Sequence, residues 1–162
     1  MPAEWEAHSA VWLAWPHDKI SFGSLNEPAE TFNPDRLAAV EKVFGRIVTE
    51  LAKHERVELL TPHPIPLHLQ EEREKGRGVT NIRFNKADYA DVWTRDYMPS
   101  FVIDNAGKLT GVKWEFDAYG KKFPDLLKDN EVFNKLLLTP ALSPTGGGGK
   151  NGEEFPEKII KP

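Results

Sequence analysis

The stretch NPDRLAAVEKVFGRIVTEL, at residues 33–51, decides the fold class of this 162-residue chain. Asn33 can cap a helix that begins at Pro34, because its side chain accepts a hydrogen bond from an unpaired helical amide and proline presets the backbone angle. The apolar residues of the stretch recur at helical spacing, at Leu37, Val40, Phe44, Ile47, Val48 and Leu51. This spacing predicts an amphipathic helix that packs on a core through one apolar stripe.

Short apolar segments lie on both sides of this helix. The segments AVWLAW at 10–15 and RVELL at 56–60 are compact and β-rich, and VTNIRF at 79–84 alternates as a strand does. A further charged helix is expected over 67–75, where Gln70 to Lys75 is mostly polar. Strands that alternate with helices predict the α/β class, in which helices cover the faces of a sheet.

The second half of the chain predicts a hairpin followed by a helix. Residues 101–103 and 109–116 are β-rich and are joined by Asp-Asn-Ala-Gly, which is typical of a turn. Helical spacing returns over 125–138. We therefore expect a unit made of strands and a helix to occur about twice within residues 1–138, although no sequence self-similarity marks the repeat.

Residues 139–162 differ in composition from the rest of the chain. They are rich in proline and glycine, with four consecutive glycines at 146–149. Such a segment gains too little from packing to offset its conformational entropy, so we expect a flexible tail or an inserted linker.

Composition argues against several partners. The 21 basic and 25 acidic side chains give a net charge of −4 and are scattered, so no basic stripe is present for nucleic acid. Apolar runs such as 10–15 are far shorter than the roughly 20 residues of a membrane-spanning helix, and the first residues lack the pattern of a signal peptide. We therefore expect a cytoplasmic protein that binds neither nucleic acid nor membrane.

Cysteine and histidine usage argues against metal and cofactor sites. The chain has no cysteine, which excludes disulfides, thiolate metal ligands and a cysteine nucleophile within it. Its five histidines do not follow a zinc-binding spacing; His63 and His68, for example, are five residues apart across two prolines. We expect no metal and no cofactor.

The densest group of chemically informative residues is DVWTRDYMP at 91–99. A carboxylate such as Asp96 can accept two hydrogen bonds from a planar guanidinium, and an indole such as Trp93 can hold the same cation on its face. These two residues could form a guanidinium clamp. The alternative is purely structural: a buried tryptophan beside an Arg–Asp ion pair, which the local pattern does not exclude.

Three blocks resemble the agmatine deiminase family, which is related to the bacterial peptidylarginine deiminases. They are MPAEWEAHSAVWLAWP at 1–16, ADVWTRDYMPSFV at 90–102 and GVKWEFDAYGKKF at 111–123. The resemblance implies the fold of that family, a five-bladed α/β propeller (pentein-like) with a central active site. Residues 1–138 would supply about two of its five units, as an N-terminal portion.

The resemblance also implies a chemistry. In the family, a cysteine thiolate attacks the guanidinium carbon, ammonia leaves, and water hydrolyses the covalent intermediate with help from a histidine. Agmatine is thereby converted to N-carbamoylputrescine in putrescine and polyamine biosynthesis. Matching by motif makes Asp96 a catalytic residue that binds the substrate guanidinium, and places Trp93 in the wall of the pocket. No cysteine block or histidine block matches here, so we expect the chain alone to be inactive.

Three positions depart from the family pattern. Met98 stands where the family usually has glycine, and Asp117 and Tyr119 stand where it usually has asparagine and tryptophan. A methionine at this point would be costly if the backbone needed a positive φ. Asp117 would add a second negative charge near Asp96 if the two segments meet.

Two other functions stay open from the sequence. The chain could be a noncatalytic truncated fragment or a guanidinium-binding module, and its substrate could be peptidyl-arginine rather than the small guanidinium compound agmatine. An incomplete propeller would leave strand edges unpaired, which favours assembly with a partner and leaves a homo-oligomer open.

Overall fold

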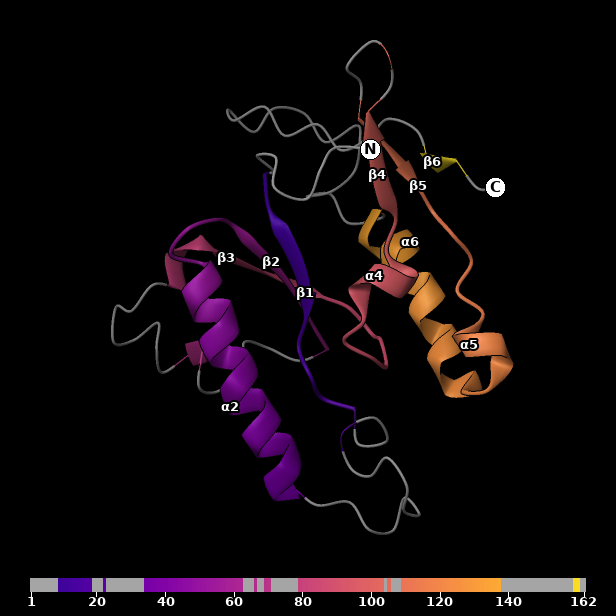
Figure 1. Ribbon diagram of the computed structural model, residues 1–162. Coiled ribbons are helices and arrows are strands. Elements are labelled where there is room, and N and C mark those ends of the chain that lie inside the picture. Colours follow the sequence, from indigo (N-terminus) through magenta and orange to yellow (C-terminus); the bar gives the residue numbers. More distant parts are fainter. Residues whose placement is uncertain are drawn as a thin grey trace. The chain divides into compact units, whose positions relative to one another are not determined.

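The computed structural model describes residues 9–18, 22, 34–62, 66, 69–70, 79–103, 105, 109–137 and 159–160. These residues fall into two compact units, of which the first ends at Thr94 and the second begins at Arg95. Each unit contains both strands and helices (Figure 1).

The first unit is built on a parallel sheet of order β1-β2-β3. Its strands are β1 (Val11–Ala14), β2 (Val57–Thr61) and β3 (Ile82–Lys86). Helix α2 (Pro34–Leu51) connects β1 to β2, as a parallel pair requires, and packs on one face of the sheet (Figure 1). The predicted strand–helix–strand order is therefore confirmed in this unit, although Asn33, the expected helix cap, lies outside the described residues.

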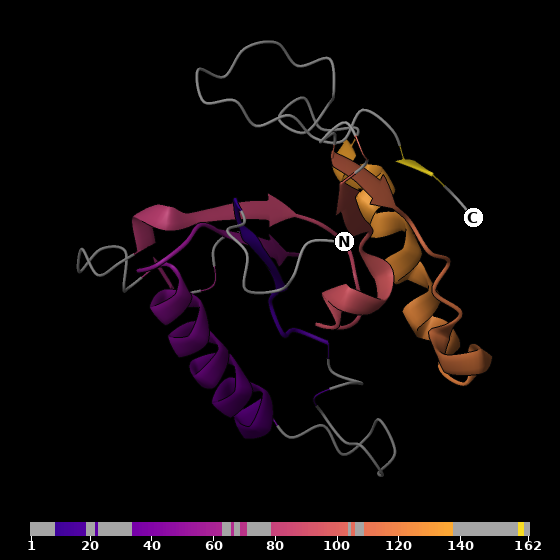
Figure 2. The same cartoon turned by 45° about the horizontal axis from the view of Figure 1, so that its top comes forward.

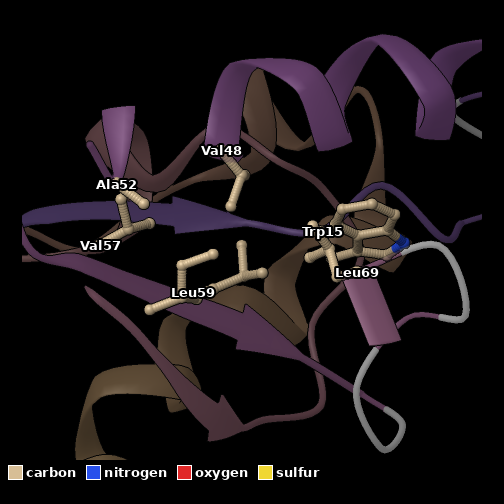
Figure 3. Packing of buried hydrophobic residues seen from close by; sticks show 7 residues of the cluster. Trp15, Val48, Ala52, Val57, Leu59 and Leu69 are labelled. Atoms are coloured by element: carbon tan, nitrogen blue, oxygen red, sulfur yellow. The ribbon is translucent and has the colours of Figure 1, made fainter. Parts of the chain in front are cut away.

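The register aligns apolar residues on the face of the sheet that α2 covers. Val57 and Leu59 of the central strand lie opposite Val11 and Leu13 of β1, and Val57 also lies opposite Ile82 of β3. The buried cluster on this face consists of Trp15, Val48, Ala52, Val57, Leu59, Leu69 and Ile82 (Figure 3). Burial of these side chains against α2 is the main source of stability of the first unit.

The opposite face of β2 carries a buried charge. Glu58 is 2% exposed and accepts a hydrogen bond of 2.7 Å from the side chain of Asn85 on the neighbouring strand. The guanidinium of Arg56 lies 3.0 Å from the other carboxylate oxygen of Glu58, and that of Arg83 lies 3.9 Å from it. Hydrogen bonds and opposite charge thus compensate the burial of this carboxylate.

The predicted apolar stripe of α2 is wrong at one position. Ile47 is 45% exposed, whereas its neighbour Val48 is fully buried. The helix contacts the sheet through Phe44, Val48 and Leu51, and the next residue, Ala52, completes the contact. Adjacent residues of a helix point in different directions, because each turn contains 3.6 residues. The predicted stripe includes both Ile47 and Val48, so it is wider than the surface of the helix that contacts the sheet.

The second unit contains a hairpin and a series of short helices. Strands β4 (Ser100–Ile103) and β5 (Leu109–Val112) pair antiparallel, which confirms the predicted hairpin, although β5 ends four residues before the expected Phe116. Helix α6 (Val132–Leu137) lies beside this hairpin in both views (Figures 1 and 2). It buries Val132, Phe133 and Leu136.

Two predicted elements have a different local geometry. The expected strand 79–84 begins with a 3₁₀ turn, η2 (Val79–Asn81), in which the Asn81 side chain donates to the carbonyl of Ala52. The expected helix 125–138 begins as a 3₁₀ helix, η3 (Pro124–Glu131), in which the Asn130 amide exchanges two hydrogen bonds with the backbone of Phe116. Both deviations involve contacts to distant residues, which local periodicity does not encode.

Most of the segment 139–162 lies outside the described residues, as does most of the expected helix 67–75. Within the tail, Ile159–Ile160 forms the two-residue strand β6, which pairs parallel with β5. The expected boundary at residue 138 stays a prediction.

Candidate functional site

The predicted cluster 91–99 forms a short helical turn. Helix α4 (Thr94–Tyr97) begins directly after Trp93 and carries Asp96 in its single turn. Thr94 lies in the first unit, where its hydroxyl donates to the carbonyl of Trp12 at 3.4 Å. Pro99 follows and prevents the helix from continuing, because proline disfavours helical geometry at the preceding residue.

Trp93 is not a core residue. Its side chain is 59% exposed, the largest exposed fraction among the exposed apolar side chains of the described residues. The purely structural alternative required a buried tryptophan beside an Arg–Asp ion pair. The exposure of Trp93 argues against this alternative. An exposed indole in this position leaves a face to which a cation could bind.

Met98 does not project into an open site. It is 7% exposed, and the adjacent Tyr97 is 1% exposed. Positive φ values at residues other than glycine occur, within the described parts of the chain, at Ala118, Tyr119 and Lys121, and Met98 is not among them. The exchange of glycine for methionine therefore fills core volume and does not strain the backbone there.

A left-handed turn in the second unit carries Tyr119. The turn α5 (Ala118–Lys121) has φ values of 55°, 58°, 74° and 61° in chain order, so its backbone is left-handed throughout. The carboxylate of Asp117 accepts a hydrogen bond of 3.0 Å from the amide of Gly120, and the carbonyl of Asp117 accepts one of 2.7 Å from the amide of Lys121. Asp117 thus closes the turn.

The turn brings Tyr119 to the predicted guanidinium-binding residue. The hydroxyl of Tyr119 donates to Oδ2 of Asp96 at 2.6 Å. Both residues lie in the second unit, so this contact belongs to one compact part of the molecule. Sequence reasoning identified Asp96 but did not assign this role to Tyr119; the Asp-Ala-Tyr-Gly turn was the available signal.

One of the five histidines packs against another aromatic ring. His17 packs edge-on against the ring of Tyr89, with ring centroids 4.6 Å apart. Within the parts of the chain that the structure describes, no group of three or more histidine, aspartate or glutamate side chains could hold a metal ion. In the same parts, no helix is both long enough and apolar enough to cross a bilayer. Trp114 is 54% exposed.

Comparison with known proteins places these features in a family. Residues 1–148 match the family model of the Porphyromonas-type peptidyl-arginine deiminases. The chain belongs to this family. The match spans all three sequence blocks that suggested the assignment, so the predicted resemblance is confirmed.

Curated members of the family are similar over most of the chain. Agmatine deiminase of Stutzerimonas stutzeri is 31% identical over 141 residues, and agmatine deiminase of Pseudomonas aeruginosa strain LESB58 is 32% identical over 143 residues. Each alignment covers 85% of this chain but 34% of the relative. The chain therefore spans about a third of the length of these relatives.

Solved structures agree with the family assignment. A variant of the C. jejuni agmatine deiminase with substrate bound superposes with a TM-score of 0.60 and 27% identity, covering 83% of this chain and 34% of that one. Agmatine deiminase of Enterococcus faecalis gives a TM-score of 0.60 at 24% identity, which supports the fold. The mixed α/β class predicted from the sequence is thus confirmed.

Proposed function

We propose that this chain supplies the guanidinium-binding part of an agmatine deiminase site, with Asp96 as the carboxylate that holds the cation. The observation that carries this proposal is the placement of Asp96: it lies on α4 within the family's block and accepts the Tyr119 hydroxyl at 2.6 Å. A carboxylate is suited to a planar guanidinium, which donates two parallel hydrogen bonds.

Trp93 is proposed to line the binding site because of its place in the motif that resembles the family. Its exposed ring offers a π-face, and a cation on such a face gains about 0.5–2 kcal/mol. The naming of the similar proteins as agmatine deiminases, one of them solved with substrate bound, supports agmatine as the ligand.

The proposal includes a larger assembly around this chain. In the family, the cysteine nucleophile and the histidine that assists hydrolysis belong to other blocks, and this chain has no cysteine. We propose that residues 1–138 form about two of five propeller units and that catalysis requires the remaining units. The product would be N-carbamoylputrescine, within putrescine biosynthesis.

Titration of the full 162-residue chain with agmatine, followed by calorimetry and by tryptophan fluorescence, tests the binding role. We expect saturable binding that Asp96→Asn weakens by about 10-fold or more, because a hydrogen bond to a charged group contributes about 1.5–3 kcal/mol. Asp125→Asn, which removes the same charge from an exposed position of the second unit, should change the affinity by less than about twofold. Equal affinity in the wild type and Asp96→Asn would contradict the proposal.

A second candidate is deimination of peptidyl-arginine, which the description of the matching family favours. The two functions differ in what lies beyond the guanidinium: a free amine in agmatine and a peptide backbone in peptidyl-arginine. Titration with agmatine and with an arginine residue blocked at both ends distinguishes them. Tighter binding of the blocked arginine would support the second function.

A further inference from the structure

The contact between Tyr119 and Asp96 joins two segments of the second unit. Asp96 lies on the helical turn α4, and Tyr119 lies on the left-handed turn α5, 23 residues later in the chain. The donated hydrogen bond of 2.6 Å occupies one lone pair of Oδ2. An ionised carboxylate has about four acceptor positions, so Oδ1 and part of Oδ2 can still accept hydrogen bonds from a bound cation.

Tyr119 is 49% exposed, and two aromatic rings contact it. Phe116 and Phe123 contact it edge-on, with centroid distances of 5.2 Å and 6.3 Å. The backbone of Tyr119 is itself left-handed, with φ of 58° and ψ of 53°. Strained backbone at a bulky residue persists only where the surrounding structure compensates it, and such positions concentrate at functional sites.

We propose that Tyr119 is a positioning residue: its hydroxyl orients the Asp96 carboxylate and thereby favours planar guanidinium ligands over primary ammonium ligands. This inference rests on the proposed function of Asp96. A guanidinium presents donors in a rigid fork, so its binding depends on the orientation of the carboxylate plane. An ammonium group is a compact charge with rotatable donors and depends on this orientation much less.

The test compares agmatine with 1,5-diaminopentane, a diamine of similar length in which an ammonium replaces the guanidinium. Binding of both to the full chain is measured by calorimetry for the wild type, Tyr119→Phe, Asp96→Asn and the double variant. Tyr119→Phe keeps the ring and its contacts with Phe116 and Phe123, and removes only the hydroxyl. Circular dichroism and the thermal unfolding midpoint verify that each variant is folded.

We expect Tyr119→Phe to weaken agmatine binding by about fivefold, the effect of losing one hydrogen bond, and to change diamine binding by less than about twofold. The agmatine effect should disappear in the Asp96→Asn background, because the hydroxyl acts through that carboxylate. Equal losses for agmatine and the diamine would indicate a merely structural role and overturn the inference.

The outcomes also separate the inference from the function on which it rests. If Asp96→Asn weakens agmatine binding and Tyr119→Phe does not, only the inference is overturned. If Asp96→Asn leaves agmatine binding unchanged, the proposed function is overturned and the inference fails with it. A loss in Tyr119→Phe that persists in the double variant also overturns the inference.

Discussion

Asp117 and Tyr119 stand where the family usually has asparagine and tryptophan, and the two exchanges have different consequences. Asp117 uses a side-chain oxygen to accept the amide of Gly120, and an asparagine has an equivalent oxygen. Asp117 was expected to add a second negative charge near Asp96. Its carboxylate accepts a hydrogen bond within its own turn. Tyr119, by contrast, introduces a hydroxyl that contacts Asp96 directly.

The role of Asp117 can be measured as stability. Ala118, Tyr119 and Lys121 each adopt a left-handed backbone, which costs about 1–2 kcal/mol for a residue with a side chain. Removing the acceptor that closes this turn by Asp117→Ala should lower the free energy of unfolding by about 1 kcal/mol, measured by urea denaturation. Asp117→Asn, which keeps the acceptor, should lie within about 0.5 kcal/mol of the wild type. Similar losses in both variants would show that the hydrogen bond to Gly120 does not hold the turn.

Helix α2 contacts the sheet through a narrower surface than its predicted apolar stripe. Val48 is fully buried in the cluster with Val57 and Leu59, and Phe44 packs against Trp15 at a ring-centroid distance of 6.1 Å. The indole nitrogen of Trp15 also donates to Glu41 of the same helix at 3.0 Å. These contacts fix the rotation of α2, and that rotation leaves Ile47 exposed.

Adjacent truncations on α2 test this rotation. Val48→Ala should lower the free energy of unfolding by about 2 kcal/mol, from lost burial of two methyl groups and the cavity that remains. Ile47→Ala removes a larger group one position away but should cost less than about 1 kcal/mol, because nearly half of this residue is exposed. Urea denaturation of both variants provides the measurement. A larger loss in Ile47→Ala than in Val48→Ala would mean that the helix packs through its other face.

At the scale of the whole molecule, coverage of the relatives and amino-acid composition bear on the chemistry. It covers about a third of its agmatine deiminase relatives and contains no cysteine. If the reaction follows the family's covalent route, the 162-residue chain by itself lacks the nucleophile.

We therefore expect no release of ammonia from agmatine by this chain alone, because removal of a covalent nucleophile eliminates the principal route. An enzyme-coupled ammonia assay provides the measurement, with the agmatine deiminase of Pseudomonas aeruginosa as the positive control. Ammonia release that scales with the concentration of this chain and is lost in Asp96→Asn would show that it has a nucleophile of another kind.

The sequence by itself determined the α/β class, the α2 helix, the β4–β5 hairpin, the family, and the candidates Trp93 and Asp96. All of these depend on local periodicity, turn chemistry or motifs, which are readable within a few residues. Only the tertiary structure decided that Ile47 is exposed, that the predicted strand and helix begin with the 3₁₀ segments η2 and η3, and that Tyr119 contacts Asp96. These features depend on contacts between segments distant in the chain, and no local pattern specifies which distant groups will meet.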